Sequence, residues 1–256
     1  MNPMESVERR TATEARPRPD GKAQWRPARF AAVVVEELSH RIIGGAFAEG
    51  DVLPTEPVLC EEFGFSRTVV REGLKLLEQR GLVRVEQGRG TTVQPRAAWD
   101  LLDPDVLRIA LAYDDALSLL DDLISVRRVL EREMASAAAG NLSEGELEEL
   151  ADLIREMEGS YGDYERFRDA DNTFHAIIMR ASGNEIGRTI VRVIHRYGGV
   201  TLPLSAGASK ANLKRTAAEH QAILDALAQG DGDLAGERVS AHIEARWAER
   251  KSSKGA

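Results

Sequence analysis

The chain has 256 residues, of which 43% are hydrophobic and 30% are charged, so its composition is that of a soluble globular protein with room for two domains. No apolar run approaches the ~20 residues that a transmembrane helix needs, so we expect no contact with a membrane. The Arg- and Pro-rich start lacks the apolar segment of a secretory signal. The single cysteine, Cys60, excludes an internal disulfide framework and favours a reducing, cytoplasmic location.

The negative charge is unevenly distributed along the chain. The net charge is −8, but residues 97–256 hold 19 basic and 28 acidic side chains, which leaves 15 basic and 14 acidic side chains in residues 1–96. A nucleic-acid-binding surface in the first part would therefore depend on a local basic patch and not on overall charge.

The first part of the chain follows the order of a winged helix-turn-helix domain, which we place over residues 29–95. Residues 1–28 show no hydrophobic period and are predicted to be a disordered tail. The elements then expected are a helix from Ala28 to the Gly44-Gly45 pair, a short helix from Thr55 to Phe63, a helix over Arg67–Arg80, and strands over Leu82–Glu86 and Thr91–Val93. Thr55 and Ser66 are expected to cap the second and third helices. Helices followed by a glycine-linked hairpin predict a small β wing on a helical domain.

The third of these helices has the pattern of a DNA-recognition helix. Apolar residues at helical spacing would form its buried stripe, and basic and hydroxyl side chains occupy the opposite face. Such side chains can reach base edges and phosphates from the first turns of a helix. The residues expected to contact DNA from this helix or from the tip of the wing are Arg67, Thr68, Arg71, Lys75, Gly88 and Arg89. Taken alone, the helix could equally be an ordinary amphipathic helix with a solvated basic face, and the order of the elements around it favours DNA binding.

The second part of the chain is predicted to be an all-helical antiparallel bundle over residues 103–250. A linker over 96–102 precedes it, and a short tail over 251–256 follows it. Asp103-Pro104 opens one helix, and Ser143 with Glu146 forms a capping box for another. The remaining helices are expected at 115–139, 163–181, 185–197, 211–229 and 233–250.

Four residues of the second part have the spacing of a metal site. Asp171 and His175 are four residues apart on one predicted helix, so both project from one face, while His220 and His242 lie on two other helices. Three imidazoles and one carboxylate suit a borderline divalent ion such as zinc, nickel or manganese, and leave positions for water or a ligand carboxylate. A lone histidine on a helix is, however, more often an ordinary core or surface residue. Two further histidines are given no functional role: His40 and His195.

The segment from Leu53 to Val93 resembles the DNA-binding domain of the GntR family of bacterial regulators. The matching positions are Pro54-Thr55-Glu56, Ser66-Arg67, Val70-Arg71-Glu72, Leu74, Gly81-Leu82 and Gly88. The resemblance implies that Ser66, Arg67, Thr68, Arg71 and the wing at Gly88 contact operator DNA. Many members of the family carry arginine where this chain has Pro57, which affects the expected operator sequence and not DNA binding itself.

The second part resembles the helical ligand domain, or FCD domain, of the FadR-type branch of that family in its metal-binding form. The motif that carries the resemblance is Asp171-x-x-Phe174-His175 followed by Glu219-His220 and His242. It implies that Asp171, His175, His220 and His242 bind a divalent metal ion, with zinc as the first choice and nickel or manganese as alternatives.

The same resemblance extends to two stretches that imply an effector pocket. Arg127-x-x-Leu130-Glu131 places Arg127 at the pocket, where a guanidinium would suit a carboxylate, and Gly183-Asn184 brings in Asn184. The alternative for Arg127 is a surface ion pair with Glu131 at i+4. The stretch from Trp99 to Leu107 is similar to the branch that senses sugar acids such as galactonate, which favours a sugar acid or another hydroxy acid as effector.

Together these patterns predict a DNA-binding transcriptional regulator and not an enzyme, with repression as the first expectation and activation as the alternative. A homodimer would bind a palindromic operator and leave it when a small carboxylate binds at the metal site. Two alternatives stay open: an architectural DNA-binding protein whose metal is structural, and a metal-dependent hydrolase or lyase. Against the latter, no HExxH-type pairing of ligand and general base is present in the sequence.

Overall fold

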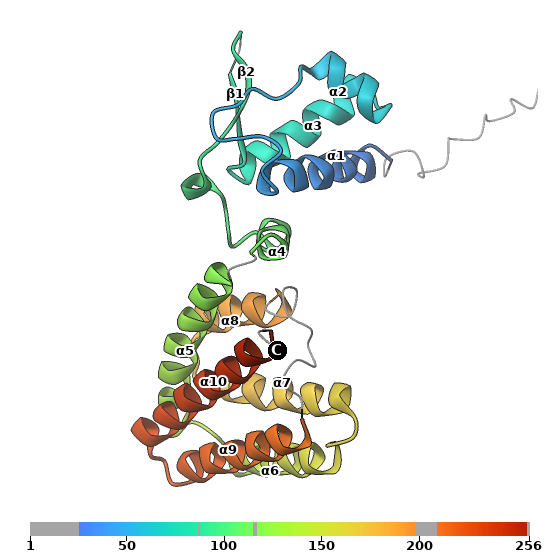
Figure 1. The fold of residues 1–256 in the computed structure, drawn as a ribbon. Helices are drawn as coiled ribbons and strands as arrows, with labels where there is room; N and C mark the ends of the chain where they lie inside the picture. The colour runs from blue at the N-terminus through green and yellow to red at the C-terminus, as the bar shows by residue number, and fades with distance from the viewer. Residues whose placement is uncertain (1–25, 87, 115–116, 198–208, 255–256) are drawn as a thin grey trace, which may run out of the picture.

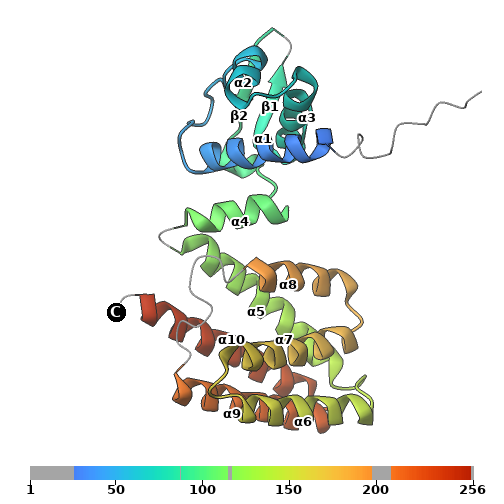
Figure 2. The same cartoon turned by 90° about the vertical axis from the view of Figure 1, so that its right-hand side faces the viewer.

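The computed structural model describes residues 26–86, 88–114, 117–197 and 209–254, in two parts stacked one above the other (Figure 1, Figure 2). The first part contains α1 (Arg26–Ile43), α2 (Glu56–Phe63), α3 (Arg67–Gln79), β1 (Val83–Glu86) and β2 (Gly90–Val93). A 3-10 turn, η1 (Arg96–Ala98), leads to α4 (Pro104–Ala112), α5 (Ser118–Ala138), α6 (Glu144–Gly159), α7 (Tyr164–Ala181), α8 (Glu185–Tyr197), α9 (Lys210–Ala228) and α10 (Gly232–Lys254). The predicted fold class, a winged helix-turn-helix followed by an all-helical domain, is confirmed.

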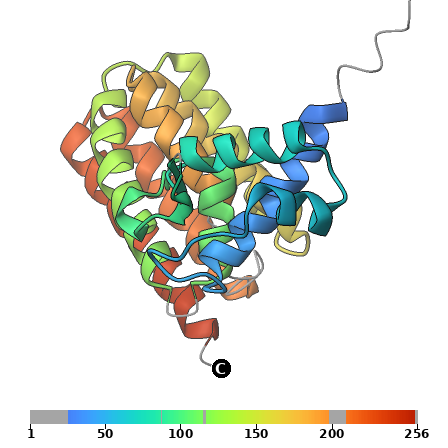
Figure 3. The same cartoon turned by 90° about the horizontal axis from the view of Figure 1, so that it is seen from above.

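Close packing of α1 against α3 forms the centre of the first part, where the two helices cross (Figure 3). A Cβ atom on Gly73 of α3 would lie 2.9 Å from Cγ1 of Val34 on α1, so only glycine allows this approach. Leu38 and Leu77 are fully buried nearby. The two strands pair antiparallel with Val83 opposite Val93, which matches the predicted wing.

The helix starts follow the predicted capping positions only in part. Thr55 and Ser66 are the N-cap residues of α2 and α3, but neither side chain makes a capping hydrogen bond. The side chain of Asp103 does accept hydrogen bonds at the start of α4, and Ser143 with Glu146 forms the predicted capping box of α6. Residues 1–25 of the predicted tail lie outside the described residues.

Three helices differ from their predicted limits. α10 continues to Lys254, four residues into the predicted tail over 251–256. α1 begins at Arg26, inside the predicted tail, because Pro27 falls in the first turn, where the missing amide costs no helical hydrogen bond. The described part of α5 begins at Ser118. There Asp114 accepts hydrogen bonds from the backbone amides of Ser118, Leu119 and Leu120 at 3.1, 2.9 and 3.1 Å, a cap that the sequence analysis did not predict.

The segment between the two parts is packed against the first part. The indole nitrogen of Trp99 donates to the carbonyl of Gln94 at 3.2 Å. Gly81 has a φ of 72°, and a Cβ atom there would lie 2.0 Å from the carbonyl oxygen of Ala98. The chain after the wing therefore passes in close contact with the C-terminal end of α3. This contact limits the movement of the two parts relative to each other.

α4 connects the two parts because its faces belong to different cores. Val106 packs with the winged-helix core, whereas Leu107 packs with the start of α5. Arg108 donates to both carboxylate oxygens of Glu36 on α1, at 2.7 and 2.8 Å. Any movement of α4 within the second part must therefore also act on α1.

The second part is held together by α10, which packs along α5. Close approach is possible because Gly232 and Gly236 face α5, where Cβ atoms would lie 2.6 Å from Ser136 O and 2.9 Å from Arg132 O. A single core joins α5, α6, α7, α9 and α10. Among the described helices, none has the length and apolar character needed to cross a membrane.

Candidate metal centre and nucleic-acid interface

The four predicted metal ligands lie together in the second part. Asp171 and His175 are one turn apart on α7, while α9 contributes His220 and α10 contributes His242. One ligand atom from each residue lies within 4.8 Å of all the others. The three histidines are buried, and Asp171 is half-buried. The structure therefore collects at one point residues that are 71 positions apart at most in sequence.

Each of the three imidazoles has an oxygen beside its Nδ1 atom. The distances are 2.8 Å from His220 to the carbonyl of Thr216, 2.8 Å from His242 to Glu219 Oε2, and 2.8 Å from His175 to Glu131 Oε2. An acceptor at Nδ1 favours the tautomer that leaves Nε2 available to a metal ion. The Nε2 atoms of His175 and His220 and the Nδ1 atom of His175 are buried and make no hydrogen bond of ordinary geometry among the described residues, although His220 Nε2 lies 3.3 Å from Asp171 Oδ1 and His175 Nδ1 lies 2.8 Å from Glu131 Oε2. Because buried polar atoms are normally satisfied, a cation at this point would complete the site.

The electrostatics of the cluster favour the protonation states that metal ligands require. Burial lowers the pKa of His242 well below its ordinary value, and the neighbouring His220 and His175 lower it further. Burial raises the pKa of the Asp171 carboxyl, but the close contact with His220 and the nearby His175 and His242 outweigh burial, so the pKa is far below its ordinary value. The neutral form of His242 and the ionised form of Asp171 are the forms that bind a borderline divalent ion.

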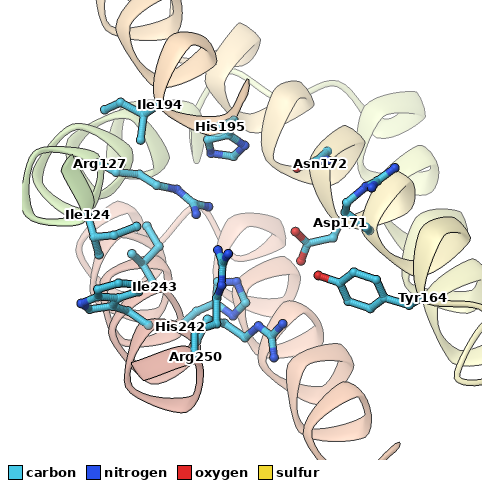
Figure 4. Close-up of a pocket in the computed structure, with 13 residues that line it drawn as sticks. Ile124, Arg127, Tyr164, Asp171, Asn172, Ile194, His195, His242, Ile243 and Arg250 are labelled. Atoms are coloured by element: carbon cyan, nitrogen blue, oxygen red, sulfur yellow. The ribbon is translucent and has the colours of Figure 1, made fainter. Parts of the chain in front are cut away.

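A cavity of about 130 Å³ lies beside the ligand cluster, between α5, α7, α8 and α10 (Figure 4). Asp171 and His242 form part of its wall, and Arg127 lies in the wall on the α5 side. Figure 4 shows the guanidinium of Arg127 turned toward the space between these residues. The cavity thus combines candidate metal ligands with a cationic side chain, which suits an acidic ligand that could also reach a metal ion.

The partner of Arg127 is a buried carboxylate. Arg127 Nε donates to Glu131 Oε1 at 2.5 Å, and the Glu131 side chain is 0% exposed. The ion pair between Arg127 and Glu131 is therefore present. It lies inside the domain, whereas the alternative considered from the sequence was a pair on the surface. Burial raises the pKa of Glu131, but the charges of Arg127 and His175 outweigh this and lower it well below its ordinary value. Glu131 is thus ionised and connects Arg127 in the cavity wall to His175, a candidate metal ligand.

His195 belongs to this site, although the sequence analysis gave it no role. Its Nε2 atom lies 2.8 Å from Glu131 Oε1, and the residue lines the cavity from α8. Burial lowers the pKa of His195, and the charge of Arg127 lowers it further. Glu131 and His195 are 64 residues apart on different helices, so no spacing could have connected them.

Asn184 has a different place from the one implied by the resemblance. Its Oδ1 atom accepts a hydrogen bond from the backbone amide of Gly187 at 2.9 Å, which caps the start of α8. Asn184 lines neither of the two cavities beside the histidine cluster. We therefore leave it out of the effector site proposed below.

The predicted recognition face of α3 is exposed to solvent. Val70, Leu74 and Leu77 form its buried stripe, as the spacing predicted. The predicted contact residues at the helix and its start are all exposed: Ser66, Arg67, Thr68, Arg71 and Lys75. α3 therefore presents its polar face outward while its apolar face is fixed on the rest of the domain.

Arg71 is already engaged by a carboxylate within the domain. Its Nε atom donates to both oxygens of Glu56, at 2.9 and 2.8 Å, and Glu56 is the first residue of α2. The pair thus links the two helices of the helix-turn-helix. At the wing, Gly88 has a φ of 81° and the side chain of Arg89 is 81% exposed. Both wing residues can be approached from solvent.

Comparison with known proteins finds matches to both parts of the chain. Residues 30–93 match the bacterial regulatory proteins of the gntR family, and residues 122–245 match the FCD domain. The galactonate operon transcriptional repressor of Escherichia coli is 31% identical over 202 residues, which are 79% of this chain and 88% of that protein. LutR of Bacillus subtilis is 31% identical over 79% of this chain and 92% of its own length, and the repressor NanR of Cronobacter sakazakii is 27% identical over 97% and 95%.

Two solved structures have the same fold. McbR/YncC of E. coli has a TM-score of 0.50 at 22% identity and covers 88% of this chain and 98% of its own. Lar of Listeria monocytogenes has a TM-score of 0.52 at 21% identity and covers 87% and 96%. Both domain matches and the sequence relatives are transcription regulators and not enzymes. The predicted resemblance is therefore confirmed, and the chain belongs to the GntR family of bacterial transcriptional regulators, with an FCD domain after its DNA-binding domain.

Proposed function

We propose that this regulator is a repressor that binds a two-fold symmetric operator as a homodimer and leaves it when a small hydroxy acid binds at a divalent metal ion in the FCD domain. One observation carries the proposal. The cluster of Asp171, His175, His220 and His242 lies beside a cavity that also holds Arg127. A site built only for structural metal would have no need of a cavity with a guanidinium in its wall.

The metal-binding part of the proposal rests on the set of donor atoms. Three imidazole nitrogens and one carboxylate oxygen would hold the ion, and zinc suits them first, with nickel or manganese as alternatives. When bound, the ion would supply a Lewis-acidic centre for ligand oxygens. Asp171 and His242 line the cavity, so the ion would be accessible from it.

The part of the proposal that concerns the acidic effector rests on Arg127 and on the relatives. Arg127 is fixed by the buried Glu131, and its guanidinium faces the cavity, where it can hold a carboxylate. The similarity to the galactonate operon repressor supports a sugar acid or a related hydroxy acid. An α-hydroxy acid could use both its hydroxyl and its carboxylate oxygens at the metal ion.

The DNA-binding part of the proposal rests on the exposed face of α3. A single copy of the chain offers one recognition helix, whereas a dimer would place two in successive major grooves about 34 Å apart. Ser66, Arg67, Thr68, Arg71 and Lys75 would then face the groove, with Gly88 and Arg89 of the wing at the flank. Effector binding needs a coupling of only about 1–3 kcal/mol to change operator affinity ~5–150-fold.

The proposal is tested on an operator selected by the protein from a random-sequence DNA pool. Fluorescence anisotropy would follow release of this DNA as galactonate, lactate or another hydroxy acid is added, with zinc-loaded and with chelated protein. We expect release by at least one acid with zinc and none after chelation. His220→Ala should abolish the response, whereas Gln221→Ala, an exposed neighbour on α9, should retain it.

The same assay separates the alternatives. An architectural protein with a structural metal would hold the operator unchanged with every acid tested. A hydrolase or lyase would consume the acid, so product formation measured by NMR would reveal it. Release that persists fully after chelation would show that the metal ion is not part of the sensor.

A further inference from the structure

A second cavity, of about 240 Å³, lies between α7 and α8. Four residues of α7, from Asn172 to Met179, and four residues of α8, from Arg188 to His195, line it. On each helix the four positions follow the spacing i, i+3, i+4, i+7, which is that of a single helix face. The cavity is therefore formed where one face of α7 meets one face of α8, and we call it the α7–α8 cavity.

The α7–α8 cavity differs from the cavity beside the metal cluster in most of its lining. Asn172 and His195 line both cavities, whereas Arg127, Asp171 and His242 line only the one beside the metal cluster. A ligand in the α7–α8 cavity would therefore be recognised by other residues than the hydroxy acid of the proposed function.

The α7–α8 cavity connects the surface of the domain to its apolar core. Ala176 and Arg192 line it and are exposed to solvent. Met179 and Val191 also line it, and both are buried. An apolar group of a ligand would gain free energy by covering these two side chains, because apolar surface then leaves water.

Two arginines of α8 have unused hydrogen-bond donors at this cavity. Arg192 makes no hydrogen bond or ion pair with any of the described residues. Nη2 of Arg188 donates to Glu185 Oε2 at 2.5 Å, but the Nε atom of Arg188 is buried and has no hydrogen-bond partner among the described residues. Because buried N–H groups are normally paired, the Nε–H of Arg188 calls for an acceptor from outside the chain.

The charge of the lining is positive. Among the described residues that line the α7–α8 cavity, none is acidic. The imidazoles of His175 and His195 each lie 2.8 Å from an oxygen of Glu131 on α5, so these two side chains already have an anionic neighbour. Arg192 has none, and a ligand carboxylate would supply the acceptor oxygens that a guanidinium binds.

The volume sets the size of the ligand. A cavity on the order of 150 Å³ is enough for a molecule the size of benzene. The α7–α8 cavity, with about 240 Å³, has room for a six-membered ring and a carboxylate, which is roughly nine non-hydrogen atoms.

We infer that the α7–α8 cavity is a second ligand site, which binds a compact apolar monocarboxylate. The apolar body of the ligand covers Met179 and Val191, and its carboxylate accepts hydrogen bonds from Arg192 and from Nε of Arg188. This inference goes beyond the proposed function, because it adds a site that uses neither Arg127 nor the carboxylate of Asp171.

NMR titrations of the zinc-loaded full chain with three small molecules test the inference. Benzoate has both the ring and the charge, benzamide has the ring without the charge, and acetate has the charge without the ring. We expect benzamide to bind about tenfold or more weakly than benzoate, because it loses the charge-assisted hydrogen bonds. Acetate should also bind about tenfold or more weakly, because it leaves the apolar side chains uncovered.

Variants of residues that line only the α7–α8 cavity locate the site. Arg192→Gln should lower affinity for benzoate about tenfold and change that for benzamide less than twofold. Ala176→Leu should lower affinity for benzoate at least tenfold, because the larger side chain fills the cavity from an exposed position. Arg196→Gln is the matched control, since Arg196 is exposed one turn further along α8 and lines neither cavity. Zinc content and thermal unfolding show whether each variant is folded.

The outcomes separate this inference from the proposed function. Absence of benzoate binding, or equal affinity for benzoate and benzamide, overturns the second site. Wild-type affinity for benzoate in both Arg192→Gln and Ala176→Leu overturns it as well, since benzoate would then bind elsewhere. None of these results touches operator release by hydroxy acids, and failure of every hydroxy acid to release the operator would overturn the proposed function alone.

Discussion

Glu131 offers a sharp test of the site because a single buried carboxylate serves several partners. Arg127 donates to it at 2.5 Å, His195 Nε2 lies 2.8 Å from it, and the Nδ1 atom of His175 lies 2.8 Å from its second oxygen. Glu131→Gln keeps the size of the side chain but replaces one acceptor oxygen with a donor. At least one of the three contacts is therefore lost, and the positive charge of Arg127 loses its counterion.

The magnitude follows from the contact to a metal ligand. Replacing the group that hydrogen-bonds a ligating histidine lowers metal affinity about 10- to 100-fold, which corresponds to about 1.4–2.7 kcal/mol. We expect the upper half of this range for Glu131→Gln, because the amide both fails to orient His175 and leaves Arg127 to repel the incoming cation. Breaking a buried ion pair also costs about 3–5 kcal/mol of folding stability, so the variant should unfold at lower urea.

The measurement is a zinc titration against a competing chelator, combined with urea unfolding of the metal-free protein. Glu133→Gln is the matched control, because Glu133 lies two residues away on α5 and is exposed. The control should keep wild-type zinc affinity and wild-type unfolding. Zinc affinity of Glu131→Gln within twofold of wild type would refute the view that Glu131 orients His175.

Three further predictions concern the DNA interface, the metal site and pH. Arg71→Ala should weaken operator binding at least about tenfold in fluorescence anisotropy and leave zinc content unchanged; unaltered binding would show that α3 is not the recognition helix. His220→Ala should lower the stability gained from added zinc, measured as the shift in thermal unfolding, and a full zinc shift would place the metal elsewhere. The folded pKa of His242 lies below its unfolded value of about 6.5, so this group stabilises the metal-free protein above that pH and stability falls as pH drops, by up to about 1.4 kcal/mol per unit. Urea midpoints at pH 7.5 and 5.5 test this, and a midpoint that rises on acidification would contradict it.

Features set by local sequence were predicted well. The spacing of apolar residues predicted α3 and the bundle helices with limits close to the observed ones. The capping box at Ser143 is also present, as its spacing predicted. The i, i+4 spacing of Asp171 and His175 also decides their common face on α7, because helix geometry alone determines it.

Features set by tertiary packing were not predicted. His195 reaches Glu131 only because α8 packs against α5, and no local pattern encodes that contact. Thr55 and Ser66 stand at N-cap positions without capping hydrogen bonds, which depend on side-chain rotamers that sequence does not report. The row of His242, Arg246 and Arg250 could have been noticed at i, i+4, i+8, but only the fold shows that a cavity faces it.

Three helices connect the proposed effector cavity to the DNA-binding domain. α5 carries Arg127 in the cavity wall, and at its start it packs in one small core with Leu107 of α4. α4 in turn packs Val106 into the winged-helix core and binds Glu36 of α1 through Arg108. A ligand that draws Arg127 toward the metal end would therefore act on α5, then on α4, and then on α1, against which α3 is fixed at Gly73. Because these contacts are close-packed and paired by charge, we expect a displacement at the cavity to change the orientation of the whole winged-helix domain, with α1 and α3 moving together.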